Sequence, residues 1–303
     1  MAWLDGREIV CKYRSMAQVP LDFQAIRRIA ITALFSDDVL FEKVVLKGGN
    51  ALNLALGLSD RTSLDLDFSI ENDFEDIEDV RKRISEALRR RFGSAGYVVF
   101  DFKFERKPKE LREGANPRWG GYMVSFKLTD QEKYEKLAGN IDALRRDSLV
   151  IGPNQQRVFT IDLSKCEYVQ GKRKVEIDNY SVYVYSSEMI AVEKLRAICQ
   201  QMPEYALKPY PTPRARDFFD IHLIVSRTGV DLTSAENLEL TRQIFAAKEV
   251  PLRLLASIGA FREFHRPDWE SVRTSTKAHL KEFDHYFDFV VNVVSSMKSL
   301  WNV

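Results

Sequence analysis

The chain has 303 residues, of which 45% are hydrophobic and 29% charged, and this composition is ordinary for a globular protein. The length allows one large domain or two of average size, so a substantial core is expected. A formal net charge of +1 excludes a global field that would attract nucleic acid or a membrane, so any nucleic-acid surface must be a local patch.

Targeting and cysteine patterns predict a cytoplasmic protein with no membrane contact. The N-terminal segment MAWLDGREIVCKYR lacks the apolar run of a signal peptide, and no stretch approaches the roughly 18 apolar residues of a membrane span. Cys11, Cys166 and Cys199 show no CxxC spacing and no cluster with histidine. They are typical of reduced thiols, not of a disulfide framework or a zinc site.

The first hundred residues alternate between helical and strand patterns. Residues 20–35 carry apolar side chains at helical spacing, and residues 44–46 form a short apolar run that predicts a strand. A helix is expected from Asn50, whose side chain can serve as the N-cap. Residues 63–70 alternate polar and apolar, which is the period of a strand, and residues 76–92 have one apolar stripe of a helix.

The middle of the chain predicts more of a sheet, and the rest predicts helices. Strands are expected at residues 97–104, 121–128, 157–163 and 180–185, separated by turn and charge clusters. The pattern is helical from residue 187 onward, so we place a boundary near residue 186. Residues 208–217, KPYPTPRARD, are expected to form a proline-rich loop between two helices.

The strongest chemical pattern joins Gly48-Gly49 to Asp65 and Asp67. Glycine has no Cβ, so the backbone can turn sharply between the strand and the helix and approach a ligand closely. The start of the helix offers free N–H groups to a phosphate. On a strand, residues two apart point to one face, so Asp65 and Asp67 project together with Ser63 beside them.

Two neighbouring carboxylates favour a bound cation. They repel each other unless a positive charge lies between them, and hard oxygen ligands of this type suit Mg²⁺ or Mn²⁺ completed by water and substrate phosphates. Such a site can activate an attacking hydroxyl group and stabilise a leaving pyrophosphate. The pattern therefore predicts a metal-dependent reaction of a nucleoside triphosphate (NTP).

These residues resemble the DNA polymerase β-like nucleotidyltransferase superfamily, whose signature is Gly-Gly or Gly-Ser, a short helix and Asp-x-Asp on a strand. The gap between the glycines and the acids is slightly longer here. More narrowly, KGGNALNLALGL and SDRTSLDLDF are similar to the AbiEii/AbiGii and MenT-like toxin family. That family usually has Thr or Ser after the glycines, where this chain has Asn50.

Two later segments resemble the same toxin family. SEMIAVEKLRAI, starting at residue 187, is similar to its motif with Glu-Lys-Leu, and RDFFDI, starting at residue 216, is similar to its Arg/Lys-Asp-x-x-Asp motif. The resemblance implies that Lys194 and Asp217 are functional. Asp220 shares a helical face with Asp217. With the first motif, the resemblance covers residues 44–224.

The superfamily commonly uses a third acid on a later strand, between apolar residues. Asp162, between Ile161 and Leu163, has this form and is the candidate third metal ligand. Asp101, between Phe100 and Phe102, fits the same pattern, so both positions stay open here.

The resemblance implies an α+β fold with a polymerase β-like nucleotidyltransferase lobe (residues 1–186) and a helical C-terminal lobe (residues 187–303) that completes the active-site cleft. The lobe with the mixed sheet is expected to carry helices on one side. The expected catalytic residues are Asp65, Asp67, Asp162, Lys194 and Asp217, the metal ligands are Asp65, Asp67 and Asp162, and the nucleotide contacts are Lys47, Gly48, Gly49, Asn50, Arg61, Ser63 and Lys194.

The resemblance also implies a function. A Mg²⁺-dependent nucleotidyltransferase toxin of a type IV toxin–antitoxin or phage-defence system is expected, with a cognate antitoxin as partner. It would transfer a nucleoside monophosphate from an NTP to an acceptor, and the 3′ end of tRNA is favoured. The alternatives are nucleotidylation of a protein hydroxyl group and a catalytically silent module that binds an NTP or a partner.

Two further features lead to weaker hypotheses. Ser63 lies on the face of the acids, and its phosphorylation would add about −1.5 to −2 charge and repel the NTP. The basic runs 81–83, 89–91 and 172–174 are either solvated faces or a groove for RNA phosphates. Trp119, Tyr122 and Tyr210 are either packed aromatics or base-stacking platforms.

Overall fold

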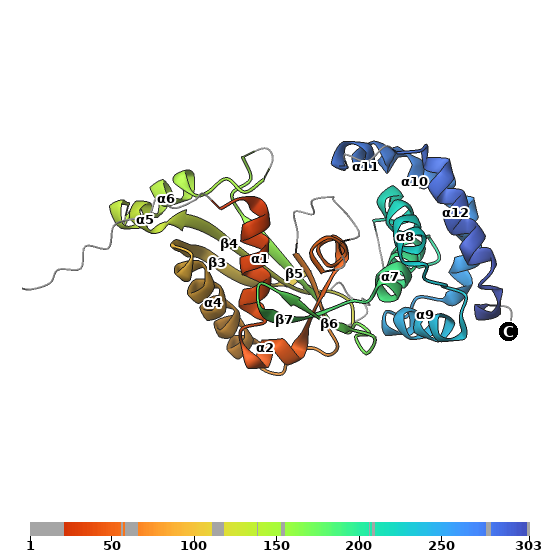
Figure 1. Ribbon diagram of the computed structural model, residues 1–303, viewed down its shortest axis with the longest axis horizontal. Coiled ribbons are helices and arrows are strands. Elements are labelled where there is room, and N and C mark those ends of the chain that lie inside the picture. Colours follow the sequence, from red (N-terminus) through yellow and green to blue (C-terminus); the bar gives the residue numbers. More distant parts are fainter. Residues whose placement is uncertain are drawn as a thin grey trace, which may run out of the picture.

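The computed structural model describes the chain in several stretches. They are residues 21–55, 57, 66–110, 118–137, 139–152, 155–205, 207, 210–276 and 280–301. All the strands in these stretches precede residue 186, and the chain after it is helical. Figure 1 shows the two resulting parts side by side, a sheet lobe and a helical lobe.

The sheet lobe is built on seven strands in the order β3-β4-β5-β2-β1-β7-β6. The strand β2 runs antiparallel to β1 and parallel to β5, and β1 runs parallel to β7, so the expected mixed sheet is confirmed. The strands are β1 (Val44–Lys47), β2 (Leu66–Ile70), β3 (Tyr97–Lys107), β4 (Gly121–Asp130), β5 (Phe159–Ser164), β6 (Arg173–Ile177) and β7 (Tyr180–Val184).

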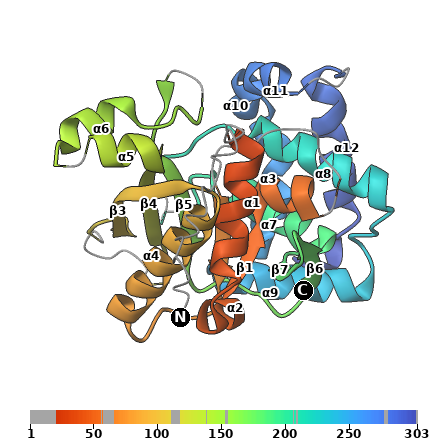
Figure 2. The ribbon, with the colours of Figure 1, turned by 60° about the vertical axis from the view of Figure 1, so that its left-hand side comes forward.

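Helices α1 and α4 run side by side across the sheet, as Figure 2 also shows. Both are amphipathic, and α4 buries Ile84, Leu88 and Phe92 in the core while its charged residues stay outside. This burial fixes which face of the sheet is left for chemistry. The helices of this lobe are α1 (Phe23–Leu34), α2 (Asp38–Lys43), α3 (Gly48–Asn50), the π-helix Ala51–Ala55, α4 (Ile77–Ser94), α5 (Gln131–Lys136) and α6 (Ile141–Asp147).

The helical lobe packs around α7 and α8. Ser186 caps α7, because its hydroxyl accepts a hydrogen bond from the backbone N–H of Met189 at 3.3 Å. Phe218 of α8 stacks on Phe287 with ring centroids 5.0 Å apart. The helices are α7 (Ser187–Cys199), α8 (Ala215–Thr228), α9 (Ala235–Ala247), α10 (Arg262–His265), α11 (Trp269–Ser275) and α12 (Phe283–Ser295), with 3₁₀ turns at Leu252–Phe261, Arg266–Asp268 and Lys298–Leu300.

Three local expectations are corrected by the structure. The helix after β1 begins at Gly48, not Asn50, and Asn50 is a buried helical residue instead of an N-cap. The segment between the strands expected at residues 157–163 and 180–185 is not only turn and charge clusters, because β6 starts at Arg173 and pairs with β7. The polar, exposed side chains of β6 hid the strand period. The loop that was expected up to residue 217 ends earlier, because α8 begins at Ala215.

No helix in the described stretches is long and apolar enough to span a membrane. Cys166 and Cys199 form no disulfide bond within the described residues, and Cys11 lies outside them.

Candidate active site

Two acids of the sheet lobe lie opposite each other on neighbouring strands. The parallel pairing of β2 with β5 places Asp67 directly beside Asp162, and the antiparallel pairing of β1 with β2 places Lys47 beside Asp67. Neighbouring strands are about 4.8 Å apart, and paired residues point to the same face. The residues before and after Asp67, Leu66 and Phe68, are buried in the core. Both carboxylates therefore project from the opposite face; we call Asp67 and Asp162 the acid pair.

Gly48, the residue that follows β1, lies against Asp67 of the acid pair. Gly48 has a φ of +68°, which glycine adopts without strain. A Cβ built on Gly48 would lie 2.6 Å from Oδ2 of Asp67. Only glycine therefore allows the backbone to approach this carboxylate so closely.

Asp101, the other candidate for a third acid, lies elsewhere. It is on β3, two strands away from β5, at an irregularity of the β3–β4 ladder and with a φ of +51°. Its carboxylate accepts hydrogen bonds from Arg145 at 2.7 and 2.9 Å. The register therefore brings Asp162, and not Asp101, to Asp67.

The donors of the acid pair fit a hard divalent cation. Asp162 already holds a positive group, because the Lys107 ammonium contacts its carboxylate. Within the described stretches, no three His, Cys, Asp or Glu side chains form a metal-binding group. Asp65, which the sequence pairs with Asp67 as a metal ligand, lies outside these stretches, as do Arg61 and Ser63. Asp67 and Asp162 thus supply two oxygen donors on one face.

A cavity of about 620 Å³ separates the sheet lobe from the helical lobe. We call it the cleft. Gly48, Gly49 and Asp67 line it from one side, and Lys194 and Asp217 line it from the other. Its wall also carries the basic residues Lys47, Arg196, Arg214, Arg216 and Lys248. The carboxylates of Glu167, Glu193 and Asp268 also line it, so the wall carries both signs of charge. Its basic side chains, next to the two glycines, are the groups that a polyphosphate can contact.

Lys194 is held by aspartates of α8. Its ammonium is 2.9 Å from Oδ1 of Asp217 and 2.7 Å from Oδ2 of Asp220. The other Asp217 oxygen accepts a hydrogen bond from Nε of Arg214 at 2.6 Å. Burial alone would raise the pKa of Asp217, but Arg214 and Lys194 lower it well below its usual range. Burial alone would lower the pKa of Lys194, but the two aspartates raise it, so both groups are ionised.

The backbone that carries Arg214 is fixed by a buried histidine. Nδ1 of His265 accepts a hydrogen bond from the backbone N–H of Arg214 at 3.0 Å. Burial lowers the pKa of His265 to about 4, so its ring is neutral at pH 7. His265 therefore has a structural role, because it holds the backbone of Arg214 at the cleft.

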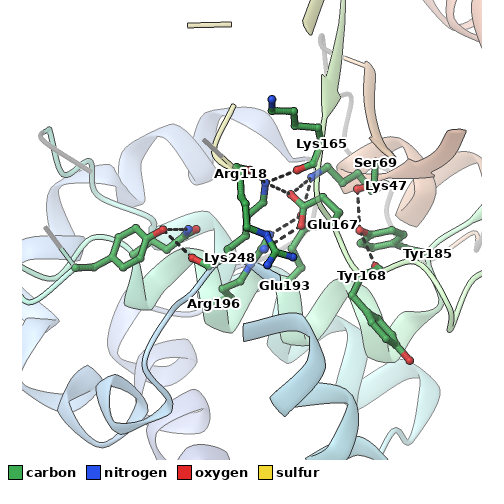
Figure 3. A network of polar contacts seen from close by, with 12 residues as sticks. Lys47, Ser69, Arg118, Lys165, Glu167, Tyr168, Tyr185, Glu193, Arg196 and Lys248 are labelled. Carbon is green, nitrogen blue, oxygen red and sulfur yellow. Dashed lines mark hydrogen bonds and ion pairs between the residues drawn. The ribbon is translucent and has the colours of Figure 1, made fainter. Parts of the chain in front are cut away.

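Lys47 points into a buried group of charges between the lobes, shown in Figure 3. Its ammonium is 2.7 Å from Glu193 of α7 and 3.5 Å from Glu167. Arg196 contacts Glu167 at 2.9 Å and Glu193 at 3.3 Å, and Lys248 lies 3.6 Å from Glu167. We call these five residues the interlobe ion cluster. The charge of Lys47 is thus paired with protein carboxylates at the cleft wall.

The cluster strongly favours ionised side chains. Burial opposes the ionisation of Glu167, but Arg196, Lys47 and Lys248 lower its pKa to about 2. Burial likewise opposes the charge of Lys47, but Glu167 and Glu193 raise its pKa above the usual range. The cluster therefore joins the end of β1 to α7 by charges that persist at neutral pH.

Asn50 is buried away from the cleft lining. Its amide oxygen accepts a hydrogen bond from Nη1 of Arg27 at 2.7 Å. Arg27 is itself fully buried on α1. The structure thus places this side chain in the packing of α3 against α1, whereas the neighbouring Gly48 and Gly49 line the cleft.

Sequence reasoning missed most of the interlobe ion cluster. Glu193 and Arg196 are three apart on a helix that is otherwise largely buried, and this spacing could have indicated a buried pair. Glu167 and Lys248 lie outside the helices and strands, where no period marks them. Their meeting depends on how the two lobes pack.

Comparison with known proteins identifies a family. The model of the nucleotidyl transferase AbiEii toxin family, a type IV toxin–antitoxin system, matches residues 29–292. A search of curated protein sequences finds no match.

Solved structures give weaker similarities. JHP933 from Helicobacter pylori is 16% identical with a TM-score of 0.47, over 92% of this chain and 91% of that chain. An antigenic nucleotidyltransferase-like protein from Paracoccidioides brasiliensis is 15% identical with a TM-score of 0.36, over 85% of this chain and 96% of that chain.

Replacing Gly48 should damage the site more than the fold. In Gly48→Ala, the new Cβ would collide with the Asp67 carboxylate and displace it. We expect nucleotidyl transfer to fall about 100-fold in kcat/KM, because misplacement of about 1 Å can cost this much. Steady-state kinetics together with urea unfolding measure both effects.

Gly229→Ala is the matched control for this substitution. Gly229 has the same φ of +68°, but a Cβ added there would meet no atom within 4 Å, so the variant shares the backbone strain without the collision. We expect a loss of about 1 kcal/mol in unfolding free energy and full activity. Equal activity of the two variants would contradict the role of Gly48.

Replacing Glu167 tests the interlobe ion cluster through the pH dependence of the unfolding free energy. In Glu167→Gln, three buried cations lose a carboxylate, and we expect the unfolding free energy to fall by about 3 kcal/mol at pH 7. Because the pKa of Glu167 is lowered from 4.5 to about 2, its stabilisation is complete above pH 4.5 and is lost as the pH falls toward 2. Urea unfolding at several pH values measures the difference between the two proteins.

The control for pH is Glu132→Gln, whose carboxylate forms an exposed pair with Lys136. Its stability should follow that of the unmodified protein at every pH. A Glu167→Gln difference that stays constant from pH 7 to pH 2 would contradict the assignment.

Proposed function

Because this chain belongs to the AbiEii family of nucleotidyl transferase toxins, we propose that its cleft binds an NTP and transfers the nucleoside monophosphate to an RNA hydroxyl group. The favoured acceptor is the 3′ end of tRNA. The observation that carries the proposal is the acid pair, aligned across β2 and β5 and touching Gly48 at the edge of the cleft.

The metal in this proposal is Mg²⁺ or Mn²⁺. Asp67 and Asp162 would hold it, with Asp65 as the further ligand expected from the sequence. When bound, such a cation favours ionisation of the acceptor hydroxyl group and stabilises negative charge on the leaving pyrophosphate. The aligned carboxylates and the absence of a Cβ at Gly48 support this assignment.

The polyphosphate would lie between Gly48-Gly49 and the basic wall of the helical lobe. Lys194, Arg214 and Arg216 line the cleft there and offset the negative charge of the triphosphate. Asp217 acts as a positioning residue, because its two oxygens bind Lys194 and Arg214 and hold them at the cleft.

The chemical step follows from these positions. The acceptor oxygen attacks the α-phosphorus in line, the bond from this phosphorus to the oxygen of the β-phosphate breaks, and pyrophosphate leaves with the electron pair. In this proposal Asp162 accepts the hydroxyl proton, because it lies beside Asp67, whereas the Asp217 carboxylate is held by Lys194 and Arg214.

The wider biology is proposed from the family. An AbiEii toxin implies a cognate antitoxin as partner and an NTP as substrate. We propose a cytoplasmic toxin that acts in phage defence by modifying tRNA. Regulation by phosphorylation of Ser63 stays a prediction, since this residue lies outside the described stretches.

A catalytically silent binding module is the second candidate. A module that only binds would not need two neighbouring acids. The strand register nevertheless places Asp67 beside Asp162. The acid pair therefore favours the enzyme.

A labelling experiment tests the proposed function. The purified protein is incubated with each α-³²P-labelled NTP, Mg²⁺ and either total RNA or total protein, and the label is followed on denaturing gels. We expect label in the tRNA band, and a loss of at least about 100-fold in Asp67→Asn, because this change removes a ligand from the proposed metal site.

Asp101→Asn is the control, because its carboxylate pairs with Arg145 far from the cleft. It should transfer label like the unmodified protein. Label in the protein fraction alone would favour protein nucleotidylation. Equal labelling by the Asp67→Asn variant would overturn the enzyme assignment.

A further inference from the structure

A second, smaller cavity of about 120 Å³ lies beside the cleft, where the ends of β3 and β5 meet the start of β4. We call it the basic pocket; it is lined by Arg106, Lys107, Pro108, Lys109, Trp119, Gly121, Tyr122 and Lys165. We propose that it binds a backbone phosphate of a nucleic-acid acceptor, next to the nucleotide whose hydroxyl group attacks the α-phosphorus. This inference rests on the proposed function and assigns the acceptor to a place on the protein.

The charges of the basic pocket favour an anion. Four of its lining residues are basic and none is acidic. Lys107 and Lys165 are paired with Asp162 and Asp73, so Arg106 and Lys109 are the two that a phosphate can use. Lys109 pairs with Glu105, and the Lys109 side chain is 76% exposed, so this pair contributes little and can exchange for a phosphate. Arg106 forms no ion pair with any carboxylate in the described part of the chain. Its guanidinium is thus available for a phosphate, which it can bind through two N–H groups.

The basic pocket borders the reacting atoms. Lys107 lines it, and the Lys107 ammonium contacts Asp162 of the acid pair. Trp119 lines both the basic pocket and the cleft. A strand whose phosphate lies at Arg106 would therefore pass Trp119, which is half-buried and can stack a base, before its end reaches the acids.

The segments that carry Trp119 and Lys165 are held in place before any ligand binds. Figure 3 shows Lys248 reaching toward Arg118 and Lys165. Its ammonium donates hydrogen bonds to the backbone carbonyl groups of both residues. The backbone N–H of Lys165 in turn donates to the carbonyl of Gly120 at 3.1 Å. A preformed pocket loses less conformational freedom on binding.

Nucleic acid fits this pocket better than a protein segment does. Clustered cations next to an accessible aromatic ring match the alternation of phosphate and base in a single strand. The basic run on α4 is different, because Arg81, Lys82 and Arg83 pair with Glu78, Glu86 and Asp79 of the same helix. Removal of the same number of positive charges from that face makes it a matched comparison for the basic pocket.

The test compares two double variants of the full chain. Arg106→Ala/Lys109→Ala removes two charges from the basic pocket, and Arg81→Ala/Lys82→Ala removes two from α4. Binding of a short fluorescent single-stranded RNA with a free 3′-hydroxyl group is measured by anisotropy, without NTP, at several KCl concentrations. KM for the NTP is measured in parallel.

We expect the basic-pocket variant to bind RNA about 10-fold more weakly and to lower the slope of log K against log[KCl] by about 1 to 2. The α4 variant should bind like the unmodified protein, and KM for the NTP should be unchanged in both. Two results would overturn the inference. One is equal RNA affinity of the two variants, and the other is transfer of label to protein at a rate that the basic-pocket substitutions do not change.

The same data separate this inference from the proposed function. RNA binding that depends on Arg106 and Lys109 but leads to no transfer in the unmodified protein would support the pocket and refute the transferase activity. Transfer to RNA that does not depend on Arg106 and Lys109 would support the transferase activity and refute the pocket.

Discussion

The register of three strands is the constraint on which the site depends. Lys47 of β1 pairs with Asp67 of β2, which pairs with Asp162 of β5, so three charged residues lie in one row across the centre of the sheet. A shift of one residue in β2 would turn Asp67 into the core and Phe68 out of it. The burial of Leu66 and Phe68 prevents this shift, so the packing of the core also sets the chemistry.

The second lobe contributes the charges that the sheet cannot supply. Lys194 and Arg214 face the cleft, and Asp217 and Asp220 fix the ammonium of Lys194. The interlobe ion cluster joins β1 to α7 directly beside the glycines. Buried ion pairs contribute little net stability, because desolvation offsets their attraction, but they allow few alternative arrangements. In this protein, their effect is to fix the position of one wall of the cleft relative to the other.

Sequence patterns predicted the elements better than their contacts. The alternation around Asp67 and the apolar stripe of α4 follow from burial on one face, so periodicity reveals them. The strand β6 was missed because its side chains are mostly exposed. The choice between Asp101 and Asp162 needed the strand order, which no local pattern contains. Glu167 and Lys248 could not be predicted because their neighbours come from distant parts of the chain. Asn50 was wrongly predicted to be a helix N-cap because its hydrogen-bond partner, Arg27, lies on another helix.

The central claim is that the acid pair and the two glycines form one site for a metal-bound triphosphate. Crystals grown with Mn²⁺ and a non-hydrolysable NTP analogue test it most directly, because manganese is located by its anomalous scattering. The account predicts a manganese peak bound by the carboxylates of Asp67 and Asp162, with the polyphosphate between Gly48-Gly49 and Lys194. A nucleotide bound elsewhere, or manganese that contacts neither carboxylate, would contradict it.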